Sequence, residues 1–536
     1  MKPRLASHLV LLTVLCAGLL VLTNSWARQN SAFDQLDLLI DIRHELMRNY
    51  VEKPDSEAMI MGAVRGMIGA LNDPYTDYLT AEDLEMFEHQ TGGSFSGIGA
   101  EVDIHQNRVR IVTPLENSPA WEAGVMAGDL ILDIDGESTL DMPLTEAVRR
   151  LTGERGTDVT IRVRRETGEE ERITITRDVI DIQTVRGFRR DADQAYDIML
   201  DPQRRIGYLR LTQFTRRTPE EMYLALTTLT EADEPIEALV LDLRFNAGGL
   251  LEAAVAVTDM FLEAEQQIVA VEGRAVAREV VEATDRTLLP QIPMVVLVNE
   301  ASASGAEILA GALQDNDRAM VVGARSFGKG SVQQVKQLKH GRGALRMTNA
   351  YYYLPSGRLI HRRDDSEVWG VDPDQGAYVP MNPEQIRQML EARREHERLR
   401  QENDGVELAE VTPQWLEETL KDPQLAAALR AAQGNLDTGE WPEVGETDGQ
   451  RFAVAQRRTD LTERREALME QLNEIDRQIA EFDHQENDDE RYERDEKEQS
   501  PPETDENDED EYYEQDQDEA RDEQPEEAVE ESPSVP

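Results

Sequence analysis

Two short turns in this chain carry the side chains best suited to chemistry, a serine and a lysine. Ser302 and Ser304 follow the apolar run 294–298, and Lys329 follows the apolar run 320–323. A serine hydroxyl becomes a nucleophile when a base takes its proton, and a lysine can be that base when its amine is kept from water. Either turn alone is ordinary, since serine often caps a helix and Gly-Lys-Gly often forms a surface turn. Together they predict nucleophilic catalysis at the ends of two buried strands.

The lysine must be largely neutral near pH 7 to work as a base, so its surroundings matter. Burial disfavours the charged ammonium and lowers its pKa. We expect Phe327 and Val332 to supply apolar cover for Lys329, because the flanking glycines let the backbone crowd around the amine. Gln333, four residues further on, is placed to orient the amine if the turn continues into a helical or bent segment.

A third turn is suited to holding a negatively charged oxygen. An apolar strand that contains Asp242 and Arg244 runs into an asparagine and two glycines. Such a turn leaves backbone N–H groups pointing outward, as an oxyanion hole requires. We expect N–H groups around Gly248 and Gly305 to serve there. We also expect Asp242, Arg244 and Glu307 to form a buried charge network beneath the site.

Length and charge narrow the class of protein. The 536 residues are enough for two to four domains with apolar cores. The formal net charge of −52 argues against nucleic acid as a partner, because phosphate binding needs a surplus of Lys and Arg. Residues 484–536 contain 25 Asp or Glu, 4 Lys or Arg and few aliphatic residues, which predicts a disordered acidic tail.

The N-terminus has the features of an export signal. Two basic residues precede a mostly apolar run at 9–22, and Ser25 and Ala27 supply the small residues of a cleavage site. We predict a signal peptide over 1–27, which would be the membrane contact of the chain if it stayed uncleaved. The single cysteine lies inside the run, so the mature chain would have neither a disulfide nor a nucleophilic thiol.

The pattern of apolar residues divides the rest of the chain into regions of different structure. Helical spacing in 31–91 gives way to short alternating strands with glycine turns in 92–178. Strand–helix alternation in 179–380 indicates an α/β sheet with functional loops at the strand ends. Helical spacing returns in 381–483, where residues 461–482 are spaced as in a short coiled coil or an amphipathic helix. The predicted fold class is multidomain α+β.

In combination, the motifs resemble those of the carboxyl-terminal processing (tail-specific) serine proteases. Ser304, Lys329 and Gln333 match that family in type and spacing, and so does the strand turn 242–249. The chain departs from the family pattern at Gly305-Ala306, where Ala-Ser is common. Other similar segments follow the family's order over roughly residues 35–430: 71–76, 92–101, 118–129, 153–157, 370–374 and 422–425.

The resemblance implies a serine endopeptidase with a PDZ-like β-rich domain inserted before an α/β protease core, between helical N-terminal and C-terminal regions. Ser304 would be the nucleophile rather than Ser302, Lys329 the base, and Gln333 the residue that orients the amine. No metal or cofactor is expected. The enzyme would be exported to the periplasm of a Gram-negative bacterium, or held at the inner membrane if the signal is retained. Family analogy also implies a homo-oligomer and, in some relatives, an adaptor protein.

The resemblance further implies that the substrates are proteins with free C-termini. The carboxylate would be held at the loop formed by Gly97, Ile98, Gly99 and Ala100. A glycine loop beside an open strand edge offers backbone N–H groups to a terminal carboxylate and lets the peptide add to the sheet as a strand.

Three other interpretations stay open at this point. A non-catalytic scaffold would bind peptides through the PDZ-like domain without cleaving them. A Ser-His-Asp hydrolase would use His340 or His361, the histidines within the α/β region. A nucleotide-binding loop at 323–330 is disfavoured, because Gly330 stands where Ser or Thr would hold Mg²⁺.

Overall fold

The structure is a computed structural model that describes most of the chain between residues 36 and 479. The described residues are 36–447 without 116–117, 166, 192–194, 290, 364–365, 367 and 398–409, and scattered positions between 458 and 479. The signal peptide predicted over 1–27 and the acidic tail predicted over 484–536 lie outside them. The chain divides into two units, residues 1–449 and residues 450–536.

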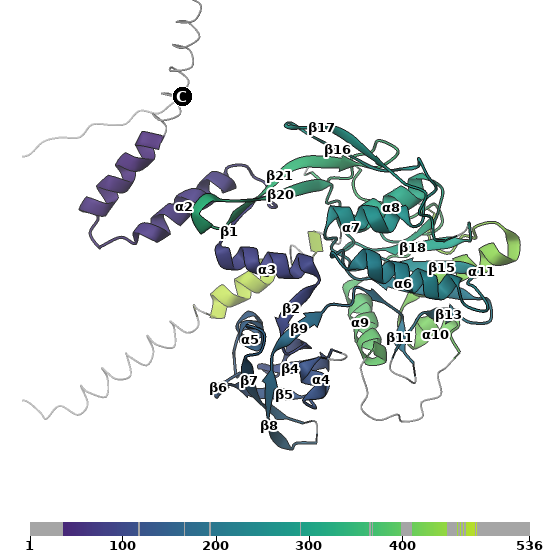
Figure 1. Cartoon of the computed structure of the whole chain (residues 1–536), viewed down its shortest axis with the longest axis horizontal. Coiled ribbons are helices and arrows are strands. Elements are labelled where there is room, and N and C mark those ends of the chain that lie inside the picture. The colour runs from purple at the N-terminus through teal and green to yellow at the C-terminus, as the bar shows by residue number, and fades with distance from the viewer. Residues whose placement is uncertain are drawn as a thin grey trace, which may run out of the picture. The chain divides into compact units, whose positions relative to one another are not determined.

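The first unit begins with the helical region that the sequence predicts. Its helices cover 36–49, Ser56–Gly69 (α2) and Ala81–Gly92 (α3). Asp55 caps α2, and Thr80 and Asp83 form a capping box at α3. Between these two helices, β1 (Asp77–Leu79) pairs antiparallel with β21 (Ala344–Tyr353). This pairing ties the N-terminal region to the α/β core, as Figure 1 shows.

A small β domain follows, as the pattern of short alternating strands indicates. Its sheet has the order β3 (Ala100–His105), β4 (Arg108–Pro114), β5 (Leu130–Ile134), β7 (Asp158–Arg164) and β8 (Glu170–Thr176), with β6 (Glu137–Ser138) paired to β5. Helices α4 (Pro119–Glu122) and α5 (Leu144–Leu151) complete the domain. β2 (Ser94–Gly97) pairs with β9 (Asp178–Asp181), so the chain enters and leaves the domain at the same place. β3 is an edge strand, with only β4 beside it among the described strands of this sheet.

The α/β core is built on a six-stranded sheet with a parallel centre. The parallel strands are β14 (Ile206–Leu211), β15 (Ala238–Asp242), β18 (Met294–Val298) and β19 (Met320–Gly323), and β10 (Val185–Arg186) and β13 (Met199–Asp201) pair antiparallel with β14. Helices cover both faces: α6 (Thr218–Thr230), α7 (Leu251–Asp259) and α8 (Gly305–Asp315) lie on one, and α10 (Pro413–Glu418) and α11 (Pro423–Thr438) on the other.

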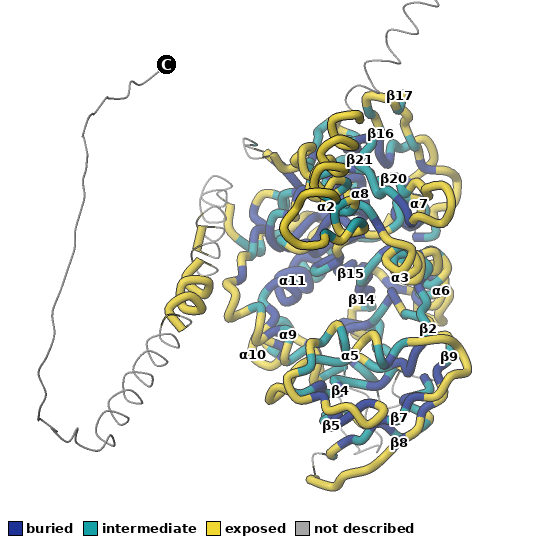
Figure 2. The backbone as a smooth tube through the Cα atoms, turned by 90° about the vertical axis from the view of Figure 1, so that its left-hand side faces the viewer, coloured by how far each residue is buried: buried dark blue, intermediate teal, exposed yellow. Residues whose placement is uncertain are grey.

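Burial on both faces explains why these strands read as continuous apolar runs. Leu239 and Leu241 pack against the first helical layer, whereas Ala238 and Val240 pack against the second. Figure 2 shows β15 and α11 as buried, in contrast to the exposed α2. Because α10 and α11 supply one face of this core, the domain boundary predicted after residue 380 crosses a single packed structure.

A second, antiparallel sheet lies beside the first. It contains β1, β21, β16 (Gln267–Gly273), β17 (Val276–Glu282) and β20 (Ser331–Gln337), with β21 at its centre. The remaining elements of the core are the hairpin of β11 (Arg189–Arg190) with β12 (Tyr196–Asp197), a 3₁₀ turn at Lys339–Gly341, and α9 (Pro383–Glu397).

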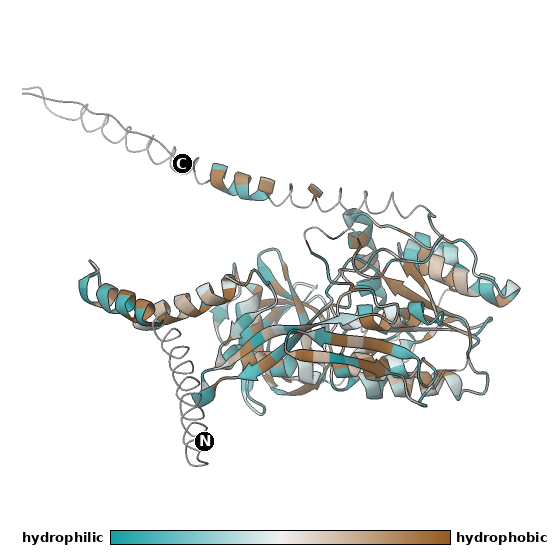
Figure 3. Cartoon of the chain, turned by 90° about the horizontal axis from the view of Figure 1, so that it is seen from above, coloured by the Kyte–Doolittle hydropathy of each residue, from teal (hydrophilic) through white to brown (hydrophobic). Residues whose placement is uncertain are grey.

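The second unit is helical at its described positions between 458 and 479, within the segment predicted to form an amphipathic helix. The apolar side chains Leu461, Leu468, Leu472, Ile475 and Ile479 are exposed there. Figure 3 shows apolar and polar residues sharing the described helical stretch near the C label. Across the described residues of both units, every helix is too short or too polar to span a lipid bilayer.

Candidate active site

The carboxyl ends of three neighbouring parallel strands carry the three turns singled out in the sequence. β15 leads into the glycine turn, β18 into the serine turn, and β19 into the lysine turn. Parallel strands place their carboxyl ends at one edge of a sheet, so segments far apart in the sequence meet there. The sheet therefore brings together the loops that the sequence marked separately.

The two serines of the first turn have different environments. The Ser302 hydroxyl is buried, donates to the Leu243 carbonyl at 2.9 Å and accepts from the Asn299 N–H at 2.9 Å. Ser304 is partly exposed and stands just before α8 with φ 56° and ψ −114°, a backbone conformation that non-glycine residues rarely adopt. Ser302 thus holds the turn, and Ser304 is the serine that is partly exposed to solvent.

Glu307 connects the backbone of the serine turn to that of the lysine turn. One carboxylate oxygen accepts from the N–H groups of Ser304 and Lys329, both at 2.8 Å. The other accepts from the Gly328 N–H at 2.6 Å and the Ser326 hydroxyl at 2.5 Å. The side chain is fully buried, and this burial raises its pKa to about 7, although the four hydrogen bonds act to lower it.

Tyr352 connects the same two residues through their carbonyl groups. Its hydroxyl lies 3.0 Å from the Ser304 carbonyl oxygen and also contacts the carbonyl oxygen of Lys329. The ring is buried in the main core cluster, on β21. Two side chains therefore connect Ser304 to Lys329. Glu307 accepts from both of their N–H groups, and Tyr352 contacts both of their carbonyl oxygens. Sequence analysis did not identify Tyr352; the signal available was its place in a run of three tyrosines after the lysine turn.

The surroundings of Lys329 favour a neutral amine. Burial, followed by the positive charge of Arg346, lowers the pKa of Lys329, and the carboxylates of Glu307 and Asp73 oppose this shift. The predicted source of cover is wrong in one respect, because Phe327 is 43% exposed to solvent. Val332 does pack against the core. The aromatic ring at the amine belongs to Tyr75, whose centroid lies 4.9 Å from the Lys329 Nζ.

Gln333 lies on β20, in an extended segment rather than the helical one that the sequence left open. Its amide donates to the Ser331 hydroxyl at 2.9 Å and lies 3.4 Å from the Thr348 hydroxyl. A β-bulge between Val332 and Gln333 interrupts the pairing of β20 with β21. The role of Gln333 in orienting the Lys329 amine stays a prediction.

The glycine turn packs directly against the serine. A Cβ placed on Gly248 would lie 2.6 Å from the Ser304 Cβ, and the φ of Gly248 is +96°, so only glycine fits here. The Gly248 N–H already donates to the Asn246 side chain at 2.8 Å. By contrast, the Gly305 N–H begins α8 and has no hydrogen-bond acceptor among the described residues. Of the two predicted oxyanion donors, Gly305 is the one available in this structure.

The buried charge network beneath the site differs from the predicted one. Arg244 donates to both carboxylate oxygens of Asp242 and to both of Asp422, the residue that caps α11. Arg393 on α9 lies 3.4 Å from Asp422. Asp242 and Arg244 are therefore paired as expected, but Glu307 is not part of the network, because its carboxylate bonds to the serine and lysine turns.

The predicted peptide-binding loop lies at the start of the edge strand β3. Gly99 has a φ of +76°, and a Cβ there would lie 2.3 Å from the Ser118 Cβ. The carbonyl groups of the loop bond inward: Ile98 accepts from the Ala120 N–H at 2.8 Å, and Gly99 accepts from the Ser118 hydroxyl at 2.7 Å. Edge strand and fixed loop are the features that strand addition of a peptide needs.

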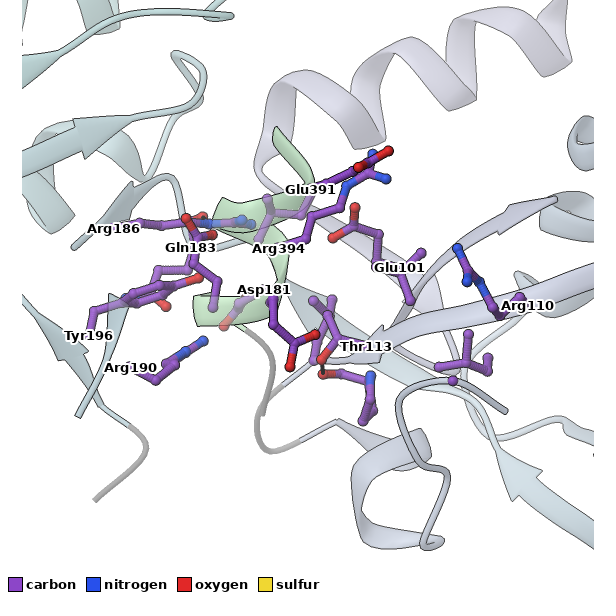
Figure 4. Close-up of a pocket in the computed structure, with 18 residues that line it drawn as sticks. Glu101, Arg110, Thr113, Asp181, Gln183, Arg186, Arg190, Tyr196, Glu391 and Arg394 are labelled. Atoms are coloured by element: carbon purple, nitrogen blue, oxygen red, sulfur yellow. Dashed lines mark hydrogen bonds between the residues drawn. The ribbon is translucent and has the colours of Figure 1, made fainter. Parts of the chain in front are cut away.

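A pocket of about 330 Å³ lies between the β domain and the α/β core. The β3–β4 pair contributes Glu101 and Arg110, and the core contributes Arg186, Arg190 and Arg394, as Figure 4 shows. Neither Ser304 nor Lys329 lines it. Among the described residues, no group of three or more His, Asp, Glu or Cys side chains is arranged to hold a metal ion.

Comparison with known proteins agrees with this architecture. Three family models match the chain: peptidase family S41 over residues 205–376, a PDZ domain over 110–165, and the activating protease CtpB N-terminal domain over 21–83. These matches fall on the α/β core, the small β domain and the N-terminal helices.

Relatives of known name are similar over much of their length. The carboxy-terminal-processing protease of Bartonella bacilliformis is 38% identical over 367 residues, which cover 67% of this chain and 79% of the relative. The carboxy-terminal processing protease CtpA of Bacillus subtilis is 32% identical over 351 residues, covering 66% and 70%. A solved photosystem II D1 C-terminal processing protease is 30% identical, covers 64% of this chain and 87% of its own, and has a TM-score of 0.38. The chain is thus a serine-type peptidase with a PDZ domain and belongs to family S41, that of the carboxy-terminal processing proteases.

Proposed function

We propose that the protein is an exported endopeptidase that recognises the free C-terminus of a protein substrate and cleaves with Ser304 as nucleophile and Lys329 as base. The observation that carries the proposal is the double connection between these residues, through Glu307 at their N–H groups and Tyr352 at their carbonyls. A base with a lowered pKa beside a strained, accessible serine is the arrangement that this chemistry needs.

The reaction runs through an acyl-enzyme. Neutral Lys329 takes the proton of the Ser304 hydroxyl while the oxygen attacks the scissile carbonyl carbon, and the Gly305 N–H donates to the developing oxyanion. When the intermediate collapses, the C–N bond breaks and the Lys329 ammonium gives its proton to the leaving amine. Water, deprotonated by the same lysine, then hydrolyses the ester and restores Ser304. Gln333 is assigned to orienting the amine.

The PDZ domain supplies substrate recognition in this proposal. The C-terminal residues of the substrate add to the open edge of β3, and the terminal carboxylate is bound at the loop of residues 97–100. The exposed edge of β3 and the fixed conformation of Gly99 support this assignment. The PDZ capture step also explains how the enzyme would select its substrates by their ends.

The test uses the purified full chain and a protein substrate with a defined C-terminal tail. We expect Ser304→Ala and Lys329→Ala each to lower kcat by at least about a thousandfold, while Ser304→Ala still binds the tail peptide. His361→Ala tests the Ser-His alternative, because His361 contacts the rings of Tyr75 and Tyr351 near Lys329. His340→Ala, at an exposed position, is the control. An active Lys329→Ala variant together with an inactive His361→Ala variant would establish a Ser-His enzyme instead. Tail binding by the wild type without cleavage would establish a scaffold.

Export and assembly rest on other observations and are tested separately. The basic and apolar residues before Ala27 support export. Cell fractionation and determination of the mature N-terminus check it, and a mature chain that begins at Met1 in the cytoplasm contradicts it. Exposed apolar side chains on the described helix of the second unit support a homo-oligomer, which light scattering measures. Co-purification from envelope extracts tests for an adaptor protein.

A further inference from the structure

The aromatic ring that faces the catalytic lysine comes from outside the peptidase core. Tyr75 lies in the turn between α2 and β1, in the N-terminal region, 254 positions before Lys329 in the sequence. The Lys329 Nζ lies 4.9 Å from the centroid of its ring. Tyr75 is partly buried, whereas Phe327, which neighbours the lysine in sequence, is exposed. A residue of the N-terminal region therefore occupies the position that a local residue was expected to fill.

The turn that carries Tyr75 is held both locally and by the core. The Asp73 carboxylate accepts from the Tyr75 N–H at 3.0 Å and from the Thr76 hydroxyl at 2.6 Å. The Thr76 oxygen in turn accepts from the Thr348 N–H on β21 at 3.1 Å. The next residue, Asp77, begins the pairing of β1 with β21. These contacts fix the Tyr75 ring relative to β21, the strand that also carries Tyr352. The position of the ring is therefore set by the fold.

Charged groups from several elements surround the lysine. Arg346 on β21 disfavours the ammonium, while Glu307 on α8 and Asp73 in the N-terminal turn favour it. The ring centroid of His361 lies 6.3 Å from that of Tyr75, and burial lowers the pKa of His361. Burial is the largest influence on the Lys329 pKa and lowers it. A ring face also attracts a cation, which favours the charged amine, but this attraction is the smaller effect at a partly exposed site.

We propose that Tyr75 is a positioning residue for the peptidase reaction: its ring keeps water from the Lys329 amine and holds that amine toward Ser304. The inference rests on the proposed Ser-Lys chemistry. It makes the N-terminal region part of the catalytic unit, because that region supplies the aromatic ring that faces the amine. The hydroxyl of Tyr75 has no part in the proposal.

The experiment compares kcat/KM from pH 6 to pH 10 for the full-length wild type and for Tyr75→Phe, Tyr75→Leu and Tyr75→Ala. Without the ring, water reaches the Lys329 amine and the pKa of the lysine rises. The acidic limb of the kcat/KM profile should therefore move to higher pH by about one unit in the alanine variant. Activity at pH 7 then falls about tenfold and returns at high pH, with KM little changed. The phenylalanine variant should match the wild type, and the leucine variant should lie between. Tyr50→Ala is the matched control, since Tyr50 is an exposed tyrosine of the same region.

A second measurement does not depend on substrate binding. The rate at which a fluorophosphonate labels Ser304 should show the same shift in pH dependence across the series. An unshifted limb in the leucine and alanine variants overturns the proposal, and so does a loss that is equal at every pH and accompanied by a lower melting temperature. Equal impairment of the phenylalanine variant also overturns it, because the hydroxyl would then be responsible. Failure of the Ser-Lys mechanism itself is seen separately, as full activity in Lys329→Ala.

Discussion

Replacing Glu307 by glutamine tests how the two catalytic turns are joined. Each carboxylate oxygen accepts two hydrogen bonds, whereas an amide has only one oxygen. We expect the glutamine oxygen to keep the bonds from Ser304 and Lys329, because Ser326 can turn its hydroxyl to accept from the amide nitrogen. The Gly328 N–H is then left facing another N–H group, and leaving one buried donor unsatisfied costs about 1–3 kcal/mol of folding free energy.

Because Glu307 titrates, the difference in stability between the wild type and Glu307→Gln should depend on pH. Burial raises the pKa of Glu307 to about 7, from an ordinary value of 4.5. Because the folded-state pKa is the higher one, the wild type is stabilised below pH 4.5 and loses that stability as pH rises through 7. Between pH 5 and pH 8 the loss amounts to roughly 2 to 3 kcal/mol. Glutamine does not titrate, so the stability advantage of the wild type over Glu307→Gln should shrink by that amount.

The same substitution should move the activity profile. The ionised Glu307 raises the pKa of Lys329, so removing its charge lets the lysine lose its proton at lower pH. We expect the acidic limb of kcat/KM to move to lower pH, with a reduced maximum because Gly328 is displaced. Urea denaturation at pH 5 and pH 8, with kcat/KM measured from pH 5.5 to 9.5, gives both quantities. A stability difference that is the same at both pH values, or a limb that moves to higher pH, would refute the reasoning.

Three further substitutions probe separate parts of the structure. Tyr352→Phe should lower kcat about tenfold with KM little changed. It should also lower stability by about 1–3 kcal/mol, because the part-buried carbonyls of Ser304 and Lys329 lose the one hydroxyl donor that they share. An unchanged kcat in steady-state assays contradicts this. Asp422→Ala should lower the free energy of unfolding by about 3–5 kcal/mol in urea denaturation, since the buried Arg244 loses one of its two carboxylate partners. A loss below about 1 kcal/mol would show that the network is dispensable. Gly99→Ala should raise KM for tailed substrates, because the added Cβ would collide with Ser118 at the predicted peptide-binding loop. Gly124→Ala is the control and should leave KM near the wild-type value, because Gly124 also has a positive φ but has open space around its Cβ.

Much of the fold could be predicted from the sequence because the patterns that indicate it are local. The strands of the α/β core are apolar throughout, since helices cover both faces, and each strand ends in a turn of small residues. The sequence alone therefore predicts that the serine and lysine turns each follow a buried strand. The charge network was predicted less well: Arg244 finds Asp422, which is 178 positions away, and nothing near Arg244 in the sequence indicates that partner.

The sequence by itself determined which turns are candidates for the chemistry, because a serine among small residues, a lysine between glycines and a glycine turn are each defined by neighbouring residues. Only the tertiary structure decided what surrounds them. Tyr75 is brought to the lysine by the pairing of β1 with β21, Tyr352 contacts it from β21 itself, and the Glu307 carboxylate bonds to the backbone of both turns from α8. Such contacts depend on strand register and helix packing over hundreds of residues, which no local spacing of residue types encodes.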